Sequence, residues 1–435
     1  MLFAAIADDY TGGSDLAGML ALRGVRTAQL FGVPAAGVVE SLEGRYDALV
    51  VCLKSRSIEA EEARRVSMAA LDRLQAASPR QIQFKYCSTF DSTSRGNIGP
   101  VTDALMDALG VEFTVAAPGL PVNGRTQYMG YLFVNGVLLS ESPMRDHPLN
   151  PMREPNLVRH LEPQTRRKVG LIAHPAVRAG AAVIREKIAG LRTAGIGIAL
   201  VDVVSDCDLT AIANAVATEK LITGGSGIAR ALPAVWRERG WHRPVSRPEE
   251  KVLGGNRRVL LLAGSCSAAT LKQIEVYRAS GAPFVAVDIE ALMHDAAAER
   301  GRLTDEAARA LKHGGRCLIY SSTPAGAREE TLRRIASNGR PAGQVPAAIE
   351  ELMGRLASDL VGAAGVRRIV AAGGETSGAI LDAIGVKAVE ILDELDPGVP
   401  ALRSLDDPPF GLALKSGNFG APDCLLKAAG YLEKL

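Results

Sequence analysis

The sequence predicts an α/β fold made of two α/β domains with mainly parallel sheets and an interdomain cleft. A chain of 435 residues, of which 47% are apolar, can bury two or three separate cores. Short apolar runs of strand length alternate with Ala-rich stretches of helical character, which is typical of parallel sheets covered by helices. This alternation stops once, at 241–256, and then starts again. We therefore expect one domain at 1–240 and another at 257–435.

The first domain begins with a strand candidate at Leu2–Ala7. A helix is expected at Ser14–Arg23, beginning at Ser14 or at the glycine pair before it. The other strands expected in this domain are Ala48–Leu53, Ile82–Tyr86, Phe113–Ala116, Val169–Ala173, Ile198–Val201 and Leu221–Thr223. The other helices expected are Ile58–Gln75, Pro175–Arg192, Leu209–Ala217 and a stretch that ends at Arg239. The proline-rich stretch 118–156 is expected to be a long ordered loop that could hold a hairpin, and such insertions are often functional.

The segment 241–256 is predicted to be a linker, because it mixes Gly, Pro, His, Arg and Trp without an apolar period. After it, strands are expected at Val259–Ala263, Phe284–Val287, Cys317–Ser321 and Arg368–Ala372. Helices are expected at Ala268–Ala279, Glu290–Glu299 and Thr304–His313. The second domain thus repeats the alternation of the first.

Charge and cysteine content exclude several classes of protein. Lys and Arg number 50 against 48 Asp and Glu, so nucleic-acid binding through bulk charge is not expected. The six cysteines form no C-x-x-C pair, which argues against a zinc ribbon or disulfide scaffold and favours mostly buried thiols in a reducing compartment. Asp8, Asp9 and Asp15 interrupt the N-terminal apolar stretch, and no apolar run approaches the ~18 residues of a membrane helix. We expect a cytoplasmic protein without a membrane partner.

Asp8 and Asp9 follow the first strand candidate and lead through Thr11-Gly12-Gly13 into a helix. In a parallel sheet this turn lies at the carboxyl end of the strand, where open α/β sheets bind ligands. One Asp could simply cap the helix, but two adjacent carboxylates can also orient a hydroxyl, accept its proton or hold a metal. We favour the functional interpretation.

The segment from Lys85 to Asn97 is the densest polar stretch after a buried strand candidate. Lys85 and hydroxyls such as that of Ser92 could bind a carboxylate, while Asp91 and Asn97 could bind substrate hydroxyls. An ordinary Ser/Thr-rich turn with Asn97 as the next helix cap is the alternative, and it does not account for Lys85 or Asp91.

Three further side chains are candidates for substrate binding. Arg56 and Arg125 lie in loops after strands, and either could make a bidentate contact with a substrate carboxylate. His147 lies in the proline-rich stretch, and a lone histidine there is as often structural as functional.

Three turns rich in glycine and hydroxyl residues follow strand candidates of the second domain. The first two open helices, whose backbone N–H groups form an anion site that glycine lets a phosphate approach. Each turn alone could be a tight βα connection that needs a positive φ, but three at one end of one sheet indicate a nucleotide site. The candidate nucleotide-binding residues are Ser265, Ser267, Gly373, Gly374, Glu375, Thr376, Lys415 and Gly417. Lys415 could contact a phosphate and Glu375 could hold Mg²⁺ through water, with no direct metal ligand assigned.

Neither the dinucleotide fingerprint G-x-G-x-x-G nor the Walker A loop is present, so a Rossmann dehydrogenase is disfavoured. Over essentially the whole chain, the sequence resembles the four-carbon acid sugar kinase family, and the motifs stand in the family's order. The motifs that carry the resemblance are D-D-x-T-G at Asp8–Gly12, D-S-T-x-R-G-N at Asp91–Asn97, G-G-[DE]-T at Gly373–Thr376 and K-S-G-x-F-G at Lys415–Gly420. Tyr10 departs from the Leu or Phe more usual in the family.

The resemblance implies an N-terminal domain that binds a sugar acid and a C-terminal domain that binds ATP with Mg²⁺. Phe84–Thr93, Pro121–Thr126 and Gly130–Val134 are similar to the 3-oxo-tetronate kinase branch, which phosphorylates the terminal hydroxyl of 3-oxo-tetronate. A threonate or erythronate kinase of the same family is one alternative, and a non-catalytic sensor of nucleotide or sugar acid is another. A homo-oligomer is possible.

For a phosphoryl transfer, Asp9 is our first choice and Asp91 our second for the group that takes the proton. The expected substrate ligands are Asp8, Arg56, Lys85, Ser92, Asn97, Arg125 and His147.

Overall fold

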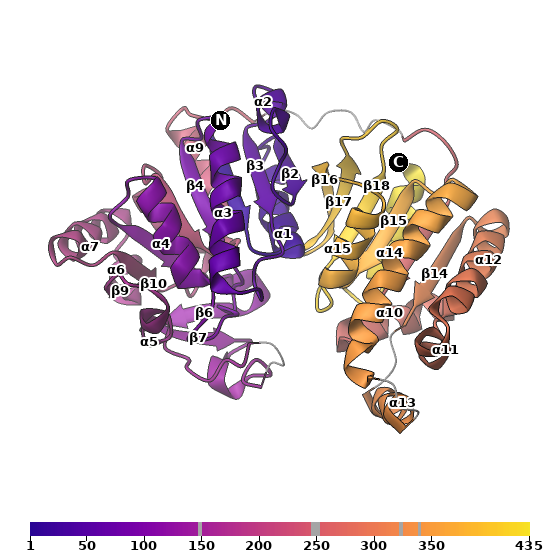
Figure 1. Ribbon diagram of the computed structural model, residues 1–435. Coiled ribbons are helices and arrows are strands. Elements are labelled where there is room, and N and C mark those ends of the chain that lie inside the picture. Colours follow the sequence, from indigo (N-terminus) through magenta and orange to yellow (C-terminus); the bar gives the residue numbers. More distant parts are fainter. Residues whose placement is uncertain (147–149, 245–252, 322–324, 338–340) are drawn as a thin grey trace. The chain divides into compact units, whose positions relative to one another are not determined.

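The computed structural model describes residues 1–146, 150–244, 253–321, 325–337 and 341–435, and the chain forms two compact units, Met1–Ser246 and Arg247–Leu435 (Figure 1). At the described ends of the expected linker, His242 is buried in the first unit and Leu253 in the second. The Leu253 N–H donates to the carbonyl of Leu435. The linker itself stays a prediction, because residues 245–252 lie outside the described part of the chain.

The first unit is built on a parallel sheet with the strand order β2-β3-β1-β4-β11-β5-β10-β9. Every residue of β1 is buried, because helices cover both faces of the sheet. A central strand in such a sheet is therefore a continuous apolar run. The strands are β1 Phe3–Ala7, β2 Thr27–Phe31, β3 Ala48–Cys52, β4 Gln81–Lys85, β5 Thr114–Ala117, β9 Val169–Ile172, β10 Ile198–Val201 and β11 Leu221–Gly224.

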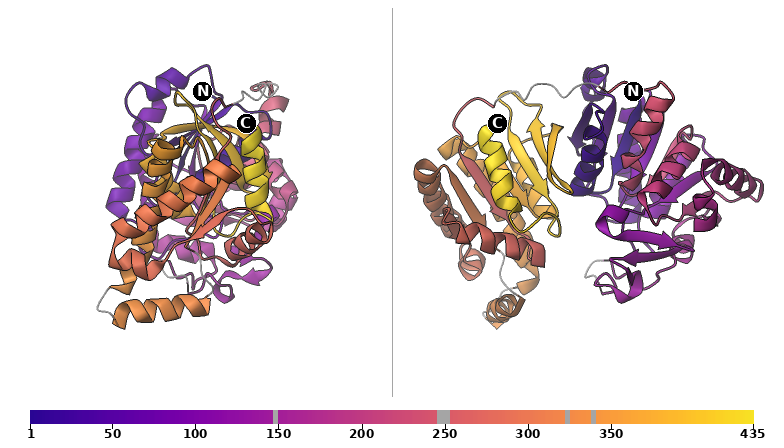
Figure 2. Two further views of the ribbon diagram at one scale, coloured as in Figure 1. Left: turned by 90° about the vertical axis from the view of Figure 1, so that its right-hand side faces the viewer. Right: turned by 180° about the vertical axis from the view of Figure 1, so that it is seen from behind.

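Helices of the first unit lie on both faces of this sheet. Figure 1 shows α3 and α4 on the face turned to the viewer, where they pack against each other, and the right-hand view of Figure 2 shows α9 on the other face. Helix α1 shares that second face, since it and α8 both contact residues 227–230, which lead into α9. The helices are α1 Tyr10–Ala21, α2 Val38–Leu42, α3 Ala60–Gln75, α4 Ile98–Ala108, α5 Leu157–Leu161, α6 His174–Arg178, α7 Ala181–Thr193, α8 Asp206–Val216 and α9 Leu232–Glu238.

The strand order of the first unit reverses direction at β1. From β1 the chain moves to β2 and β3 on one side, and then crosses to β4 on the other side of β1. The connections after β1 and β4 therefore leave toward opposite faces of the sheet, with α1 on one and α4 on the other. Such a reversal opens a crevice at the carboxyl ends of the two strands, where ligands of open α/β sheets bind.

The proline-rich stretch contains the hairpin that the sequence suggested. Strands β6 Arg125–Tyr128, β7 Tyr131–Val134 and β8 Val137–Leu138 form a small antiparallel sheet. Gly130 makes the tight turn from β6 to β7 with φ +79°, a conformation that favours glycine.

The second unit repeats this architecture on a sheet with the order β13-β14-β12-β15-β18-β17-β16. Strands β12 to β15 and β18 are parallel, while β16 and β17 run antiparallel as a long hairpin. The strands are β12 Val259–Ala263, β13 Phe284–Ala286, β14 Arg316–Tyr320, β15 Arg368–Ala372, β16 Ala388–Asp396, β17 Val399–Ser404 and β18 Gly411–Lys415.

The order of the second sheet also reverses, between β12 and β15. Helix α10 after β12 packs with α16 on one face, and α15 after β15 packs with α14 on the other. The carboxyl ends of β12 and β15 thus form a second switch point, in the other unit. The helices are α10 Ala268–Ala279, α11 Ile289–His294, α12 Ala296–Gly314, α13 Ala325–Ser337, α14 Val345–Ala364, α15 Gly374–Ala383 and α16 Cys424–Lys434.

Mixed α/β architecture with mainly parallel sheets is confirmed, but four expected helices were wrong in their bounds. Helix α1 begins at Tyr10 rather than at Ser14 or the glycine pair before it, because Asp9 caps it. The helix expected at 175–192 is two helices, separated at Gly180, whose φ of +97° does not continue a helix. The pair expected at 290–299 and 304–313 divides instead at Asp295, which is the N-cap of a long α12.

Two other expectations concern thiols and membranes. Cys52, Cys317 and Cys424 are buried, whereas Cys207 is exposed and the other two are partly exposed, so burial holds for half of the cysteines. Among the described residues, no helix combines the length and the apolar character needed to cross a membrane.

Candidate active site

The first switch point brings together polar side chains from three separate loops. In the register of the sheet, Ala7 at the end of β1 pairs with Lys85 of β4 on one side and with Cys52 of β3 on the other. Asp8 and Asp9 therefore emerge next to the end of β4, and the Asp8 N–H donates to the Lys85 carbonyl at 3.0 Å. The loop after β3 carries Arg56 to the same place.

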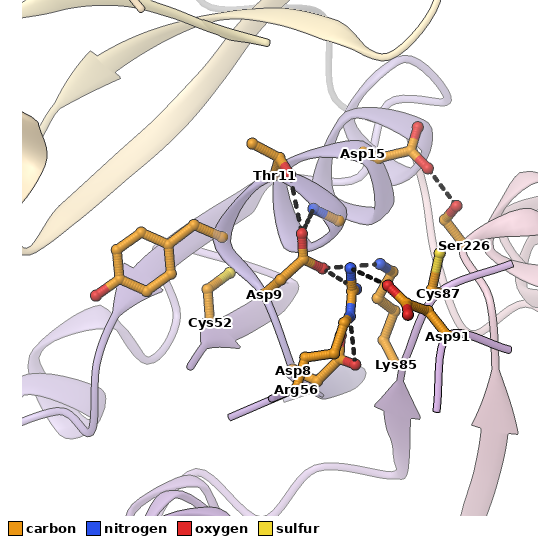
Figure 3. Close-up of polar contacts among 12 residues, drawn as sticks. Asp8, Asp9, Thr11, Asp15, Cys52, Arg56, Lys85, Cys87, Asp91 and Ser226 are labelled. Carbon is orange, nitrogen blue, oxygen red and sulfur yellow. Dashed lines mark hydrogen bonds and ion pairs between the residues drawn. The ribbon is translucent and has the colours of Figure 1, made fainter. Parts of the chain in front are cut away.

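Arg56 is the centre of this cluster, and Figure 3 shows three carboxylates turned toward its guanidinium. It donates to Asp8 through two parallel hydrogen bonds, from Nε at 2.9 Å and from Nη2 at 2.8 Å. Its Nη2 also donates to Asp9 at 2.5 Å, and its Nη1 lies 3.7 Å from a carboxylate oxygen of Asp91. With Lys85, the cluster holds two cations against three carboxylates.

Both carboxylate oxygens of Asp9 have hydrogen-bond partners, and the side chain is still partly exposed. Its Oδ2 accepts hydrogen bonds from the Thr11 hydroxyl at 2.9 Å and the Gly12 N–H at 3.0 Å, which caps α1. Its Oδ1 lies 3.4 Å from the Lys85 ammonium. A Cβ on Gly12 would lie 1.8 Å from that ammonium, so a larger residue here would displace the Lys85 ammonium from this position. The Asp9 side chain is still 24% exposed, whereas Asp8 is 7% exposed.

The two adjacent carboxyls have opposite pKa shifts. Burial raises the pKa of Asp8 above its ordinary value, although Arg56 opposes the shift. Burial acts in the same direction on Asp9, but the charges of Arg56 and Lys85, with the hydrogen bonds from Gly12 and Thr11, outweigh it and hold the pKa of Asp9 well below its usual range. Asp9 is therefore the accessible, permanently charged acceptor of the pair.

Asn97 supports the cluster from behind. Although it precedes α4, its side chain does not cap that helix. Its amide nitrogen instead donates to the carbonyls of Ser55, Arg56 and Ile58, at 2.7, 3.1 and 2.9 Å. These bonds fix the loop that presents Arg56, so the helix-cap alternative for Asn97 is wrong.

The polar segment after β4 is fixed by side chains that the sequence analysis did not select. Asp91 accepts a hydrogen bond from the Asn150 amide at 2.9 Å. The buried Ser92 hydroxyl donates to Gln164 at 3.2 Å. Both partners come from the end of the 118–156 insertion and just beyond it, and only the tertiary fold places them here.

One predicted substrate ligand, Arg125, is not part of these contacts within the described residues. Arg125 lies on β6 of the small sheet, where its guanidinium donates to the Asn123 carbonyl, and it makes no ion pair within the described residues. His147 lies outside the described residues.

The second switch point holds a pocket of about 290 Å³. Five of the predicted nucleotide ligands line it, together with apolar side chains of α11, α13 and α14 that the sequence analysis did not identify. The five predicted residues are Ser265, Gly373, Gly374, Glu375 and Thr376, and the apolar residues are Ile289, Leu332, Val345, Pro346 and Ile349.

Glycine is needed at this pocket for two different reasons. Gly373 has φ +131°, a conformation that L side chains rarely adopt. Gly264 has no such constraint, but a Cβ there would lie 2.4 Å from the Thr376 hydroxyl. Both turns therefore bring bare backbone to the pocket, at the starts of α10 and α15, where the helix dipole favours an anion.

The remaining three predicted nucleotide ligands form a network beside the pocket. Ser267 caps α10 and donates to the Gly417 carbonyl at 2.5 Å. Lys415, which is 1% exposed, donates to the Thr270 hydroxyl at 3.0 Å and to the same carbonyl at 3.1 Å. In this structure the Lys415 ammonium fastens the end of β18 to the first turn of α10.

This buried ammonium predicts a pH dependence of stability. Burial lowers the pKa of Lys415 to about 8, against a value near 10.4 in an unfolded chain. Between these values the unfolded chain binds more protons, so the free energy of unfolding gained from Lys415 rises with pH in this window. The melting temperature of the wild type relative to Lys415→Met should therefore increase by several degrees from pH 7.5 to pH 9.5.

Differential scanning calorimetry at the two pH values measures this difference. The control is Lys312→Met, which removes an exposed lysine of α12. A difference between wild type and Lys415→Met that does not change with pH would show that folding does not lower the pKa of this lysine.

Comparison with known proteins follows the same division of the chain. Residues 3–232 match a family model described as a sugar-binding N-terminal domain, and residues 260–425 match one described as a nucleotide-binding C-terminal domain. A 3-oxo-tetronate kinase from Cupriavidus necator is 46% identical over 425 residues, which are 97% of this chain and 95% of the relative. One from Burkholderia multivorans is 46% identical over 438 residues, 99% of this chain and 97% of the relative. A crystal structure from Salmonella typhimurium LT2 superposes with a TM-score of 0.87 at 37% identity and covers 98% of each chain.

The fold and these matches define the class of the protein, a phosphotransferase whose acceptor is a hydroxyl group. Within this class, the chain belongs to the four-carbon acid sugar kinase family.

Proposed function

We propose that this protein transfers the γ-phosphate of ATP to the terminal hydroxyl of 3-oxo-tetronate, giving 3-oxo-tetronate 4-phosphate, in the cytoplasm. The observation that carries the proposal is near-full-length similarity to several kinases named for this substrate. The two switch points supply a site for each reactant, a polar cluster in the first unit and a glycine-rich pocket in the second. A purely sensory role is not favoured, because these relatives are named as kinases.

In the first unit, Asp9 is proposed to accept a hydrogen bond from the reacting hydroxyl. Its low pKa makes it a weak base, but phosphoryl transfer through a loose transition state needs little basicity from this group. For this transfer it is sufficient that Asp9 orients the hydroxyl and accepts its proton late in the reaction. Asp91, held by Asn150, remains the second candidate.

The charge of the cluster changes the proposed binding of the substrate carboxylate. Arg56 already carries the carboxylates of Asp8 and Asp9, and the cluster has more acids than bases. It is therefore suited to sugar hydroxyls rather than to another anion. We assign the substrate carboxylate to Arg125, whose guanidinium makes no ion pair in the described part of the chain.

Magnesium is part of the proposal through the nucleotide. Glu375 lies in the first turn of α15, lines the pocket and is exposed, so its carboxylate fits an ion that keeps most of its waters. The ion would be shared between this one carboxylate and phosphate oxygens. When bound, the ion would neutralise phosphate charge.

The test is a coupled assay of ADP formation by the full chain with ATP and a panel of four-carbon sugar acids. We expect 3-oxo-tetronate to give a kcat/KM at least ten times that of threonate or erythronate, with the phosphate on the terminal oxygen by NMR. Faster turnover of threonate or erythronate would move the chain to another branch of the family. Binding of both ligands without ADP formation would show a sensor.

A further inference from the structure

Ser321 is a buried hydroxyl that no motif singled out. It follows β14 directly, is 2% exposed and lines the pocket of the second unit. Its N–H donates to the Ala263 carbonyl at 3.0 Å, which fixes its backbone beside the end of β12. Its Oγ has no hydrogen-bond partner among the described residues. Buried hydroxyls are nearly always paired, so one that lines a pocket points to a partner supplied by a ligand.

The sheet order places Ser321 two strands away from the glycine turn that begins α15. The glycine turns follow β12 and β15, whereas Ser321 follows β14, which lies beside β12 on the side away from β15. Since adjacent strands are about 4.8 Å apart, the ends of β14 and β15 are separated by roughly 10 Å. A phosphate chain held at the start of α15 would therefore leave Ser321 beside another part of the nucleotide.

The surroundings of the pocket agree with this placement. Ile289, Val345 and Ile349 provide apolar surface suited to a base or sugar ring, and the polar neighbour on α14 is the acid Glu350. No Lys or Arg lines the pocket within the described residues. The pocket thus offers apolar surface for a nucleoside beside its glycine turns.

We propose that the Ser321 hydroxyl hydrogen-bonds the nucleoside part of the bound nucleotide and not its phosphates. This inference rests on the proposed ATP site and adds to it which part of the ligand one side chain recognises. Its contribution to binding is then the same for every nucleotide with the same base and sugar.

The experiment measures the affinities of ATP, ADP, AMP and inorganic triphosphate for the full-length wild type and for Ser321→Ala by calorimetry, with triphosphate also tested as a competitor. We expect the variant to bind the three nucleotides more weakly by one common factor, about 3- to 10-fold. Its affinity for inorganic triphosphate should be unchanged. The matched control is Ser67→Ala, which removes a second buried, unpartnered hydroxyl from the other unit and should change none of these affinities.

Three results would overturn the inference. A loss that grows from AMP to ATP would place Ser321 at the phosphates. If Ser321→Ala has unchanged affinities and a normal melting temperature, and the wild type binds nucleotide normally, the Ser321 hydroxyl is not part of the site. A wild type that binds no adenine nucleotide would instead refute the proposed function, and this inference with it.

Discussion

Asp9→Asn is expected to lower kcat by ~10²–10⁴ while the chain still folds and binds ATP. Asparagine can accept the hydrogen bond from the Gly12 N–H about as well as aspartate, so the cap of α1 is retained. The amide cannot take the proton of the reacting hydroxyl. It also removes the carboxylate that lies 3.4 Å from the Lys85 ammonium. Steady-state kinetics with saturating ATP and sugar acid measures the change.

The matched control for this substitution is Asp295→Asn. Asp295 is also a helix N-cap, and its carboxylate accepts from the N–H groups of Ala297 and Ala298. The same chemical change at Asp295 tests the loss of a charged helix cap alone. The kcat of this variant should stay within about twofold of the wild-type value. If Asp9→Asn also keeps kcat within a few-fold of the wild type, Asp9 is only a cap, and Asp91 becomes the candidate to test.

Gly374→Val is expected to weaken ATP binding at least tenfold, about 1.4 kcal/mol, and to leave sugar-acid binding intact. Gly374 is the first residue of α15 and lines the pocket. Its conformation is helical, so valine does not require the unusual φ that makes Gly373 intolerant. The added side chain would occupy the space through which phosphate approaches the N–H groups. Calorimetric titration of each ligand separately measures both affinities.

Gly362→Val is the control, because Gly362 is a helical glycine of α14 with open space at its Cβ position. It reproduces the cost of a β-branched residue in a helix without entering the pocket. Normal ATP binding by Gly374→Val would show that the Gly373–Gly374 turn has a structural role only.

The sequence predicted secondary structure best where local chemistry decides it. β12, β15 and α10 have the residues expected for them, because a buried parallel strand must be a continuous apolar run and a Ser cap marks where α10 begins. β16 and β17 were missed, since β16 mixes apolar and polar residues without a period of two and buries only Val389 fully. The start of α1 was misplaced because Gly12 and Gly13 suggest a turn, whereas their small size is needed to fit Lys85 and Cys52.

Within the site, local sequence identified residues but not their partners. Asp8, Asp9 and Lys85 could be selected because each stands at the end of an apolar run, and a parallel sheet puts such ends on one edge. The sequence could not show that two of these carboxylates pair with Arg56. The ion pair between Arg56 and Asp8 joins residues 48 positions apart. The role of Asn97 was hidden for the same reason, since its three acceptors lie in the loop after β3.

By itself the sequence determined the α/β class, most of the strands, and the glycine turns and acidic turn that carry the family's motifs. These depend on apolar runs and on residues with special backbone freedom, which act over a few neighbours. The tertiary structure alone decided that the sheets reverse at β1–β4 and at β12–β15, and that Ser321 meets the pocket without a partner among the described residues. It also decided that the first site is a cluster with more carboxylates than cations, which suits hydroxyls. Strand order and side-chain pairing come from long-range packing and crossover connections, and a local pattern of residues does not contain them.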